Sequence, residues 1–318
     1  MATPEPSQSG LPAFMVTLSL IVHDDFSHIG QALDCVFSNM TRVIRVVVTI
    51  NRGNAEQTDA LSAAYPAVRL VVNPTPKGFA ANHNAVMREA DTSFIALLND
   101  DALLQPGALD RMLDYLGQHP ACGIVGPVVR NPDGTPQVSA FSDPTLPRML
   151  FHVSGLSRFT KSDSGLRRLF EGRTKAESLN SSTETRIVPV VVGVCMVVRR
   201  EAIQQAGLMD EDTLMYGEEF GWQRRLREKG WNAALVGEAE VIHLNQSQDL
   251  SGWRLAEHRK GMLTYFIRYQ PPWQSLILRG AISFFHGLYA LLWWPVDRAR
   301  SISHWRACGV GWNWKPAL

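Results

Sequence analysis

The stretch FIALLNDDALL constrains the fold more than any other part of the chain. Its apolar residues from Phe94 to Leu98 run directly into three polar ones, Asn99, Asp100 and Asp101. A continuous apolar run of this length is typical of a strand buried on both faces of a mostly parallel sheet. In such sheets, ligands bind beyond the carboxyl ends of the strands. We therefore expect an α/β fold with the acidic pair at a ligand-binding edge.

The two aspartates suit two kinds of role. Mg²⁺ and Mn²⁺ prefer oxygen ligands and share their coordination shell with water and phosphate, so carboxylates at a strand end indicate a metal site for a phosphate-bearing substrate. Alternatively, Asp100 or Asp101 caps a helix that begins near Pro106, because aspartate is a preferred N-cap residue. The residues alone leave both interpretations open.

Apolar runs and amphipathic segments alternate along residues 14–250. This βαβ rhythm predicts one large domain with a mostly parallel sheet flanked by helices. Strands are predicted at 14–22, 43–50, 68–72, 94–98, 123–129, 187–198 and 234–243, and helices at 29–39, 60–65, 106–118, 200–206 and 218–229, with a further helix that runs through Glu89. Residues 154–186 are polar with little periodicity, which predicts a mobile insertion or lid over the site.

The C-terminal region, residues 251–318, differs from the rest in charge and in tryptophan content. It carries nine Lys and Arg residues against Glu257 and Asp297, so its formal charge is +7 and that of the remainder is −6. Seven of the nine tryptophans also lie in it. Tryptophan with cationic side chains is typical of surfaces that rest on anionic lipid headgroups. We do not expect nucleic acid binding, because no recognisable nucleic-acid module accompanies this composition.

Within this region the run from Gly280 to Pro295 is strongly apolar. It is short for a membrane span, which needs about 20 residues, so it predicts an interfacial or re-entrant helix, with a buried core helix as the alternative. The first ten residues are polar, and the four cysteines are scattered without metal-binding spacing. We therefore expect a cytoplasmic protein that associates peripherally with the inner face of the membrane.

A second acidic pair, Glu218 and Glu219, opens a predicted helix, and His243 ends a predicted strand. Carboxylates at a helix N-terminus are favoured by the helix dipole with or without a chemical role, and a lone strand-end histidine is often structural. Taken with Asp101, these side chains are expected at one edge of the sheet. A carboxylate and an imidazole there suit a cation that also binds a diphosphate.

The turn-rich segment from Asn73 to Asn84 contains a cation, a glycine and several amides. The sequence Lys77-Gly78-Phe79 offers a positive charge and a glycine that permits close approach, and the amides could hydrogen-bond a sugar, a ribose or a base. The glycine spacing matches neither the P-loop nor the dinucleotide-binding fingerprint. An ordinary loop followed by a helix cap is the alternative.

The order of these motifs resembles glycosyltransferase family 2, particularly its bacterial rhamnosyltransferase-like branch, which has the GT-A fold. KGFAANHN and LLNDD are similar to the family's GF segment ending in Asn and to its strand ending LN-x-D. GVCMVVRR, GLMDE, YGEE and VIH are similar to its G-x-x-M-x-x-R-R, G-x-x-D-E, Y-x-E-D and strand-end His. The resemblance covers about residues 14–250 and implies a nucleotide-sugar-binding domain followed by a helical, membrane-associating extension.

The resemblance implies roles for individual positions. Asp101 and His243 are similar to the ligands of the family's Mg²⁺ or Mn²⁺, and Glu219 to its general base, with Glu218 as companion. The remaining implied positions bind the donor (His23, Asp24, Asn51, Lys77, Gly78, Phe79, Asn84, Asn99 and Asp100) or the acceptor (Asp210, Glu211 and Tyr216).

Two positions depart from the family pattern. The family often has Asp-Asn at the end of its second strand, where this chain has Ile50-Asn51, so base recognition is expected from Asn51, Asp24 or their neighbours. The base is usually Asp, and Glu219 adds a methylene. Both departures bear on the identity of the nucleotide and on acceptor geometry.

The implied reaction is metal-dependent, inverting transfer of a sugar from a nucleoside diphosphate to a hydroxyl of a lipid-linked or polysaccharide acceptor. The resemblance favours dTDP-L-rhamnose ahead of UDP-hexoses, and synthesis of O-antigen, capsule or cell wall. Expected partners are the nucleotide sugar, a glycan or polyprenol-linked acceptor and the inner membrane surface, and a homodimer stays open. The rival interpretations are a nucleotidyltransferase and an inactive carbohydrate-binding protein on the same fold.

Overall fold

The structure, a computed structural model of the whole chain, describes residues 16–38, 44–160, 184–244 and 252–317. Most of the predicted lid, residues 161–183, lies outside these ranges. Its mobility and its position over the site therefore stay predictions.

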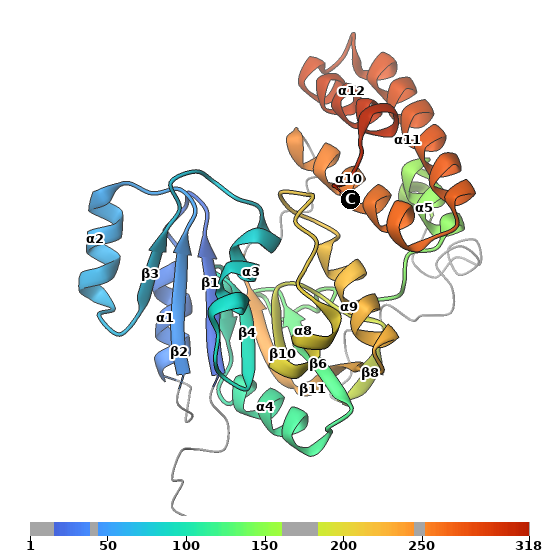
Figure 1. Cartoon of the computed structure of the whole chain (residues 1–318). Helices are drawn as coiled ribbons and strands as arrows, with labels where there is room; N and C mark the ends of the chain where they lie inside the picture. The colour runs from blue at the N-terminus through green and yellow to red at the C-terminus, as the bar shows by residue number, and fades with distance from the viewer. Residues whose placement is uncertain (1–15, 39–43, 161–183, 245–251, 318) are drawn as a thin grey trace, which may run out of the picture.

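The first half of the chain forms the parallel part of the sheet (Figure 1). Strands β1, β2, β3 and β4 run parallel in the spatial order β3-β2-β1-β4, as the βαβ rhythm predicted. In chain order the elements are β1 (Val16–Val22), α1 (Ile29–Ser38), β2 (Ile44–Ile50), α2 (Ala55–Ala64), β3 (Arg69–Val72), α3 (Phe79–Glu89) and β4 (Phe94–Asn99).

The second half makes the sheet mixed rather than mostly parallel. Strand β10 runs antiparallel to both β4 and β6, while β11 is parallel to β6 and antiparallel to β5 and β8. The elements are β5 (Ala102–Leu104), α4 (Ala108–Gln118), β6 (Cys122–Arg130), β7 (Ala140–Phe141), α5 (Leu146–Val153), η1 (Leu156–Phe159), β8 (Arg186–Val188), β9 (Val190–Val191), β10 (Cys195–Arg199), α8 (Arg200–Ala206), α9 (Glu218–Glu228) and β11 (Asn232–His243).

Three local predictions are corrected. The single strand expected at 187–198 is three short ones, interrupted at Pro189, which lacks the N–H that a continuous ladder needs, and at residues 192–194. Helix α2 starts earlier than residue 60 because Asn54 and Gln57 form a capping box. The helix-cap interpretation of Asp100 and Asp101 is wrong, because β5 follows them directly and Gly107 occupies the N-cap of α4.

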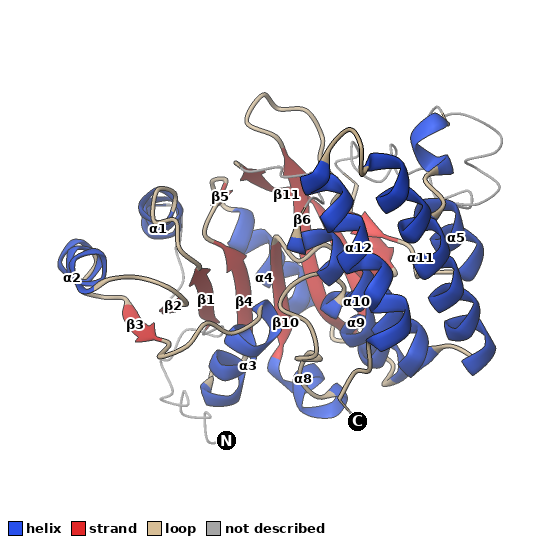
Figure 2. Cartoon of the chain, turned by 90° about the horizontal axis from the view of Figure 1, so that it is seen from above, coloured by secondary structure: helices blue, strands red, loops and turns tan. Residues whose placement is uncertain are grey.

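The sheet is buried on both faces, as the FIALLNDD run predicted. Along β4, Ala96 and Leu98 belong to the hydrophobic cluster on one face, and Ile95 and Leu97 to the cluster on the other. Helices α1 and α4 cover the first face, and α3, α8 and α9 cover the second (Figure 2). The strand ends are consequently the exposed edges at which polar groups gather.

The C-terminal region is helical, with α10 (Trp253–Tyr269), α11 (Pro272–Trp293) and α12 (Arg298–Asn313). These helices share a hydrophobic cluster with α5, so α5 packs in the C-terminal unit although it precedes it by about a hundred residues (Figure 1). Buried members of the cluster include Leu146 of α5, Phe266 of α10 and Ile282 of α11. The C-terminal unit lies beside the start of α9, where the second acidic pair is found.

Candidate functional site

Strand pairing brings Asp101 and His243 together, although they are far apart in the sequence. In the antiparallel pair of β5 and β11, His243 lies opposite Ala102. The Asp101 Oδ1 atom is 3.2 Å from His243 Nε2, and the Leu244 amide donates to the Asp101 carbonyl at 2.9 Å. Their side chains are 16% and 14% exposed, so both still reach the molecular surface. The edge that the sequence predicted from two separate strand ends is therefore formed.

Gln137 fixes the orientation of the His243 ring, a function that the sequence analysis missed. Its Oε1 atom lies 3.0 Å from His243 Nδ1, while its Nε2 donates to Asn131 Oδ1 at 2.7 Å and to the His243 carbonyl at 3.1 Å. Because the amide nitrogen of Gln137 is engaged elsewhere, its Oε1 is the atom that faces Nδ1, and Nε2 is the ring nitrogen that faces Asp101. Gln137 lies in a turn-rich stretch and carries no sequence signal that would have marked it.

The chemistry of this pair fits a divalent cation. A carboxylate oxygen and an imidazole nitrogen oriented by an amide are acceptable ligands for Mn²⁺, and the carboxylate for Mg²⁺. Across the described ranges, however, no group of three or more His, Cys, Asp or Glu side chains has the arrangement of a metal site. A cation here would thus take its remaining ligands from water and from the phosphates of a substrate.

Asn99 and Asp100 flank this pair at the end of β4. The backbone N–H of Asn99 donates to the carbonyl of Val194 at 3.0 Å, which links β4 to the loop before β10. Burial, followed by the neighbouring charge of Asp101, raises the pKa of Asp100 to about 7. The strand end is therefore a region where negative charge is poorly tolerated without a cation.

Asn51 is used inside the protein, which corrects its expected role in reading the base. It is 2% exposed; its Oδ1 accepts from the Lys77 amide at 2.7 Å and from Asn73 Nδ2 at 3.0 Å. Its Nδ2 donates to the Lys77 carbonyl and to His23 Nδ1, both at 2.8 Å. Asn51 thus positions the loop, and the exposed side chains of His23, Asp24 and Lys77 are the ones left to meet a donor.

The expected roles of Gly78 and Asn84 are corrected in the same way. A Cβ atom on Gly78 would lie 2.6 Å from the Thr213 carbonyl oxygen, so its close approach is to protein backbone. The Phe79 amide also donates to the Leu214 carbonyl at 2.8 Å. Asn84 is buried within α3 and bonds the backbone of Met209. Gly78, Phe79 and Asn84 thus connect the first part of α3 and the loop before it to residues 209–214, which precede α9.

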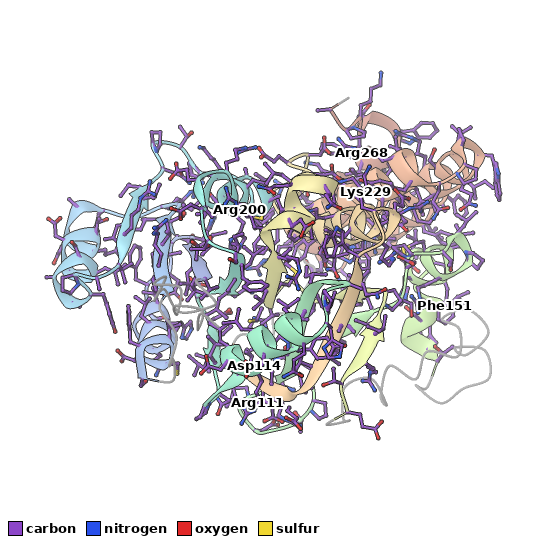
Figure 3. The ribbon with its side chains drawn as sticks, turned by 60° about the horizontal axis from the view of Figure 1, so that its bottom comes forward. Arg111, Asp114, Phe151, Arg200, Lys229 and Arg268 are labelled. Carbon is purple, nitrogen blue, oxygen red and sulfur yellow. The ribbon has the colours of Figure 1, made fainter. Side chains whose placement is uncertain are left out.

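Two of the three expected acceptor residues are engaged in ion pairs. Asp210 lies 2.9 Å from Arg225 and also pairs with Arg268, which is labelled in Figure 3. With both oxygens occupied, Asp210 links α9 to α10 and is not available to an acceptor, which corrects the prediction. Glu211 pairs with Arg88 at 2.7 Å but stays 40% exposed. Burial would raise the pKa of Glu211, but hydrogen bonds from Asn84 and Arg88 outweigh it and hold the pKa below its ordinary value.

The acidic pair at the start of α9 has two distinct environments. Glu219 is partly exposed, and its Oε2 accepts from the Gly217 amide at 3.1 Å. Glu218 is 8% exposed, and its Oε2 is buried without a hydrogen-bond partner among the described residues. Burial, then the charge of Glu219, raises the pKa of Glu218 to about 8, and burial also raises the pKa of Glu219. Glu219 is the member of the pair that a substrate can reach.

One loop connects this helix to the strand-end site. Gln223 of α9 exchanges two hydrogen bonds of 2.8 Å with the backbone of Val191, and three residues later the Val194 carbonyl binds the Asn99 amide. The loop before α9 lies on the side of the sheet where the parallel strands end (Figure 1). The loop at residues 191–194 therefore connects α9, the helix that carries Glu219, to the end of β4 that precedes Asp101.

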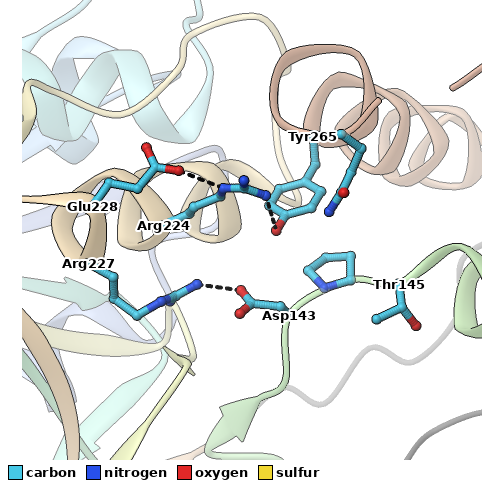
Figure 4. A pocket seen from close by; sticks show the side chains of 8 residues that line it. Asp143, Thr145, Arg224, Arg227, Glu228 and Tyr265 are labelled. Carbon is cyan, nitrogen blue, oxygen red and sulfur yellow. Dashed lines mark hydrogen bonds and ion pairs between the residues drawn. The ribbon is translucent and has the colours of Figure 1, made fainter. Parts of the chain in front are cut away.

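A separate cavity of about 400 Å³ lies between the second half of α9, the segment before α5, and α10 (Figure 4). Its cations are paired with protein groups, since Arg224 lies 2.9 Å from Glu228 and Arg227 pairs with Asp143. The lining is therefore close to neutral, and none of the predicted site residues contributes to it. We assign it to the junction between α9 and the C-terminal helices.

Comparison with curated proteins identifies relatives of known activity. The chain is 26% identical, over 273 residues, to N-acetylglucosaminyl-diphospho-decaprenol L-rhamnosyltransferase from two strains of Mycobacterium tuberculosis. The alignment covers 80% of this chain and 86% of the relative. The similarity therefore extends over four fifths of this chain and most of the relative.

Two solved structures have a similar fold. The mannosyltransferase PcManGT from Pyrobaculum calidifontis, in complex with GDP-Man and Mn²⁺, superposes with a TM-score of 0.54 at 16% identity, covering 94% of this chain and 88% of that one. GalNAc-T7 with UDP, GalNAc and Mn²⁺ superposes with a TM-score of 0.56 at 12% identity over 82% of this chain. This chain spans 49% of GalNAc-T7. Both neighbours are glycosyltransferases, so the GT-A fold implied by the motifs is confirmed.

The family model for "Glycosyltransferase like family 2" matches residues 27–262. The match contains both acidic pairs, His243 and the first part of α10. With the fold and the ordered motifs, it leads to one conclusion: the chain belongs to glycosyltransferase family 2.

Proposed function

We propose that the protein transfers a sugar, with inversion, from a nucleoside-diphosphate sugar to a hydroxyl of a lipid-linked acceptor in bacterial surface or cell-wall glycan synthesis. dTDP-L-rhamnose is the proposed donor, and a polyprenol-linked glycan the proposed acceptor, on the basis of the relative's name. The observation that carries the proposal is the Asp101–His243 pair, in which the contact of Nδ1 with Gln137 turns Nε2 of His243 toward Asp101.

Asp101 and His243 are proposed to hold Mn²⁺ or Mg²⁺. When bound, the cation would neutralise charge that develops on the departing diphosphate. Both structural neighbours were solved with Mn²⁺, which supports a divalent cation for this chain as well. The exposed ammonium of Lys77 is proposed to assist from the donor side.

Glu219 is proposed as the general base. The acceptor oxygen forms a bond to the anomeric carbon as the bond from that carbon to the diphosphate oxygen breaks, and the electron pair leaves with the diphosphate. The proton of the acceptor hydroxyl passes to the Glu219 carboxylate. A pKa raised by burial brings Glu219 closer to the operating pH, where general bases are most effective. Glu211 and Tyr216 are the remaining candidates for contact with the acceptor.

Helix α11 is proposed to bring the enzyme to a membrane that carries the acceptor. Among the described helices, α11 is the one that is long and apolar enough to span a bilayer, and a third of its apolar window is buried. Its exposed side chains form a stripe: Trp273, Leu276, Ile277, Phe284, Leu288, Leu291 and Leu292. Because Leu278, Ile282 and Ala290 on its other face are packed in the protein, we propose that α11 lies along the lipid interface.

Cationic side chains at the end of this stripe support an anionic lipid surface as the partner. The guanidinium of Arg300 lies 4.1 Å from the ring centre of Trp293, and that of Arg298 lies 5.5 Å from Trp294. Tryptophan with arginine is typical of the headgroup region, and each basic residue near an anionic surface contributes about 1 kcal/mol. We therefore propose peripheral association with the cytoplasmic face of the membrane.

Glu219→Gln tests the proposed reaction. General base catalysis contributes about 10²–10⁴-fold, so release of nucleoside diphosphate from dTDP-rhamnose in the presence of acceptor and Mn²⁺ should fall by that factor. Binding of the donor, followed by titration calorimetry, should be unchanged because Glu219 does not contact it.

Glu238→Gln, on the exposed surface of β11, is the matched control and should retain full activity. Retention of most turnover by Glu219→Gln would exclude Glu219 as the base. Failure of every nucleotide sugar in a donor panel to react would overturn the proposed reaction itself.

A further inference from the structure

The turn that precedes the acidic pair has an uncommon backbone. Among the described residues, Tyr216 is the one non-glycine with a positive φ, +78°, and Gly217, the N-cap of α9, follows with φ +93°. A left-handed conformation at a non-glycine residue costs about 1–3 kcal/mol and persists only where the surroundings impose it. The turn directly positions Glu219, whose carboxylate accepts from the Gly217 amide.

The group that imposes this turn is the backbone of α10. Gly261 lies in the interior of that helix, where glycine costs about 1 kcal/mol relative to alanine, and its backbone is not in the left-handed region. Glycine is needed at position 261 because there is no room for a side chain. A Cβ atom at residue 261 would overlap the Tyr216 carbonyl oxygen and lie 2.9 Å from the Tyr216 carbonyl carbon. Neither is a side-chain atom, so rotation about a side-chain bond cannot relieve the clash.

A second contact from α10 holds the same segment. Glu257, one turn before Gly261, is 5% exposed, and its Oε2 accepts from the Leu214 amide at 3.0 Å. Its other oxygen accepts from Lys260 at 2.6 Å, which holds the carboxylate in place. One face of α10 therefore contacts the loop on both sides of residue 215.

We propose that Gly261 and Glu257 are positioning residues for catalysis, which makes α10 a part of the active-site scaffold and not only a link to the membrane-facing helices. The proposal rests on the function assigned above to Glu219. Through the turn at Tyr216 and Gly217, the C-terminal unit sets where the Glu219 carboxylate stands relative to the acceptor hydroxyl.

Gly261→Ala is the direct test. The added methyl must displace the turn or the helix by on the order of 1 Å, and a misplacement of about 1 Å costs up to 10²-fold in rate. We expect kcat to fall by about 10–100-fold while the KM for the donor is unchanged, because the proposed donor contacts are made by Asp101, His243 and Lys77 and not by Glu219. The Gly217 hydrogen bond lowers the pKa of Glu219, so its loss should move the acidic limb of the kcat against pH profile to higher pH.

Two matched controls carry the same substitution in neighbouring helices. A Cβ atom at Gly280 of α11 or at Gly309 of α12 would meet no atom within 4 Å. Gly280→Ala and Gly309→Ala should therefore leave kcat and its pH profile unchanged and slightly increase stability. They separate the effect of the contact from that of a more helix-prone residue.

A second pair of variants decides the question if Gly261→Ala does not fold. Glu257→Ala removes the oxygen that accepts from the Leu214 backbone N–H, so it should lower kcat and leave the donor KM unchanged. Glu257→Gln retains an acceptor oxygen and should restore kcat. Wild-type kcat and an unmoved acidic limb in Gly261→Ala, or in Glu257→Ala where the first is insoluble, would overturn the proposal. If Glu219→Gln is inactive while these variants are fully active, the inference fails and the proposed function stands. If Glu219→Gln is active, the role of Glu219 as the base fails and the inference fails with it, while turnover by the wild type still supports the proposed reaction.

Discussion

The two acidic sites of this enzyme differ in how they are held. Asp101 lies between β4 and β5, and its carboxylate is 3.2 Å from the imidazole of His243. The pairing of β5 with β11 holds the two residues together. Glu218 and Glu219 follow a left-handed turn, and one carboxylate oxygen of Glu218 has no hydrogen-bond partner among the described residues. The first site is therefore stable by virtue of the sheet, while the second depends on a helix from the C-terminal unit. Substitutions that affect one site should leave the other largely intact.

After Glu219→Gln, the largest effect is expected at the strand-end site. Asp101→Ala should remove the Mn²⁺ dependence of donor binding and lower kcat by about 10²–10³-fold, because charge on the leaving group is no longer compensated. The measurement is donor affinity and nucleoside diphosphate release across a Mn²⁺ titration. Asp59→Ala, exposed on α2, is the control. Unchanged metal dependence in Asp101→Ala would place the cation elsewhere.

A smaller loss is expected when the support of His243 is removed. Gln137→Leu deletes the acceptor for His243 Nδ1, and partners of this kind are worth about 10–100-fold in metal affinity. Gln137→Glu keeps an acceptor oxygen at that position and should retain much of the affinity. Equal Mn²⁺ affinities in both variants, from the concentration dependence of turnover, would show that Gln137 does not orient the ligand. The pH profile set by Glu219 should be unmoved in either case.

The membrane-facing stripe of α11 should be separable from both acidic sites. Phe284→Glu with Leu291→Glu should weaken binding to vesicles that contain phosphatidylglycerol, because burial of each such side chain contributes about 1.5–3 kcal/mol. Ile187→Glu, at an equally exposed apolar position on β8, should have no effect. Release of diphosphate with a soluble acceptor should be unchanged throughout. Wild-type vesicle affinity in the double variant would exclude this face as the docking surface.

The smallest effect concerns stability and tests the burial of Glu218. Its folded pKa of about 8 lies above the ordinary value of 4.5, so the stability it contributes is present below pH 4.5 and is lost as the pH rises toward 8. Glu218→Gln does not titrate and should therefore be more stable than wild type at pH 8, by more than about 1 kcal/mol, the equivalent of a single pKa unit. The two proteins should be similar near pH 4.5. Urea unfolding at both pH values measures this, and a difference independent of pH would contradict the assigned burial.

Much of the strand-end site could be predicted from the sequence because it is encoded locally. The apolar run before Asn99 specifies a buried strand, and the βαβ rhythm orders the strands, so Asp101 and His243 fall at one edge. The same reasoning failed for Asn51, Asn84 and Asp210, whose side chains form hydrogen bonds or ion pairs within the protein. A polar side chain in a motif does not reveal whether it faces a substrate or another loop.

The sequence by itself determined the GT-A fold, the family and the pairing of one carboxylate with one histidine, because hydrophobic periodicity and motif order are properties of the chain. Only the tertiary structure decided that Gln137 orients His243, that β10 runs antiparallel, and that Gly261 of α10 supports the turn before Glu219. Each of these depends on a contact between residues distant in the sequence. Such contacts form only when whole elements pack, and no local pattern of residues records which backbone atoms will then meet.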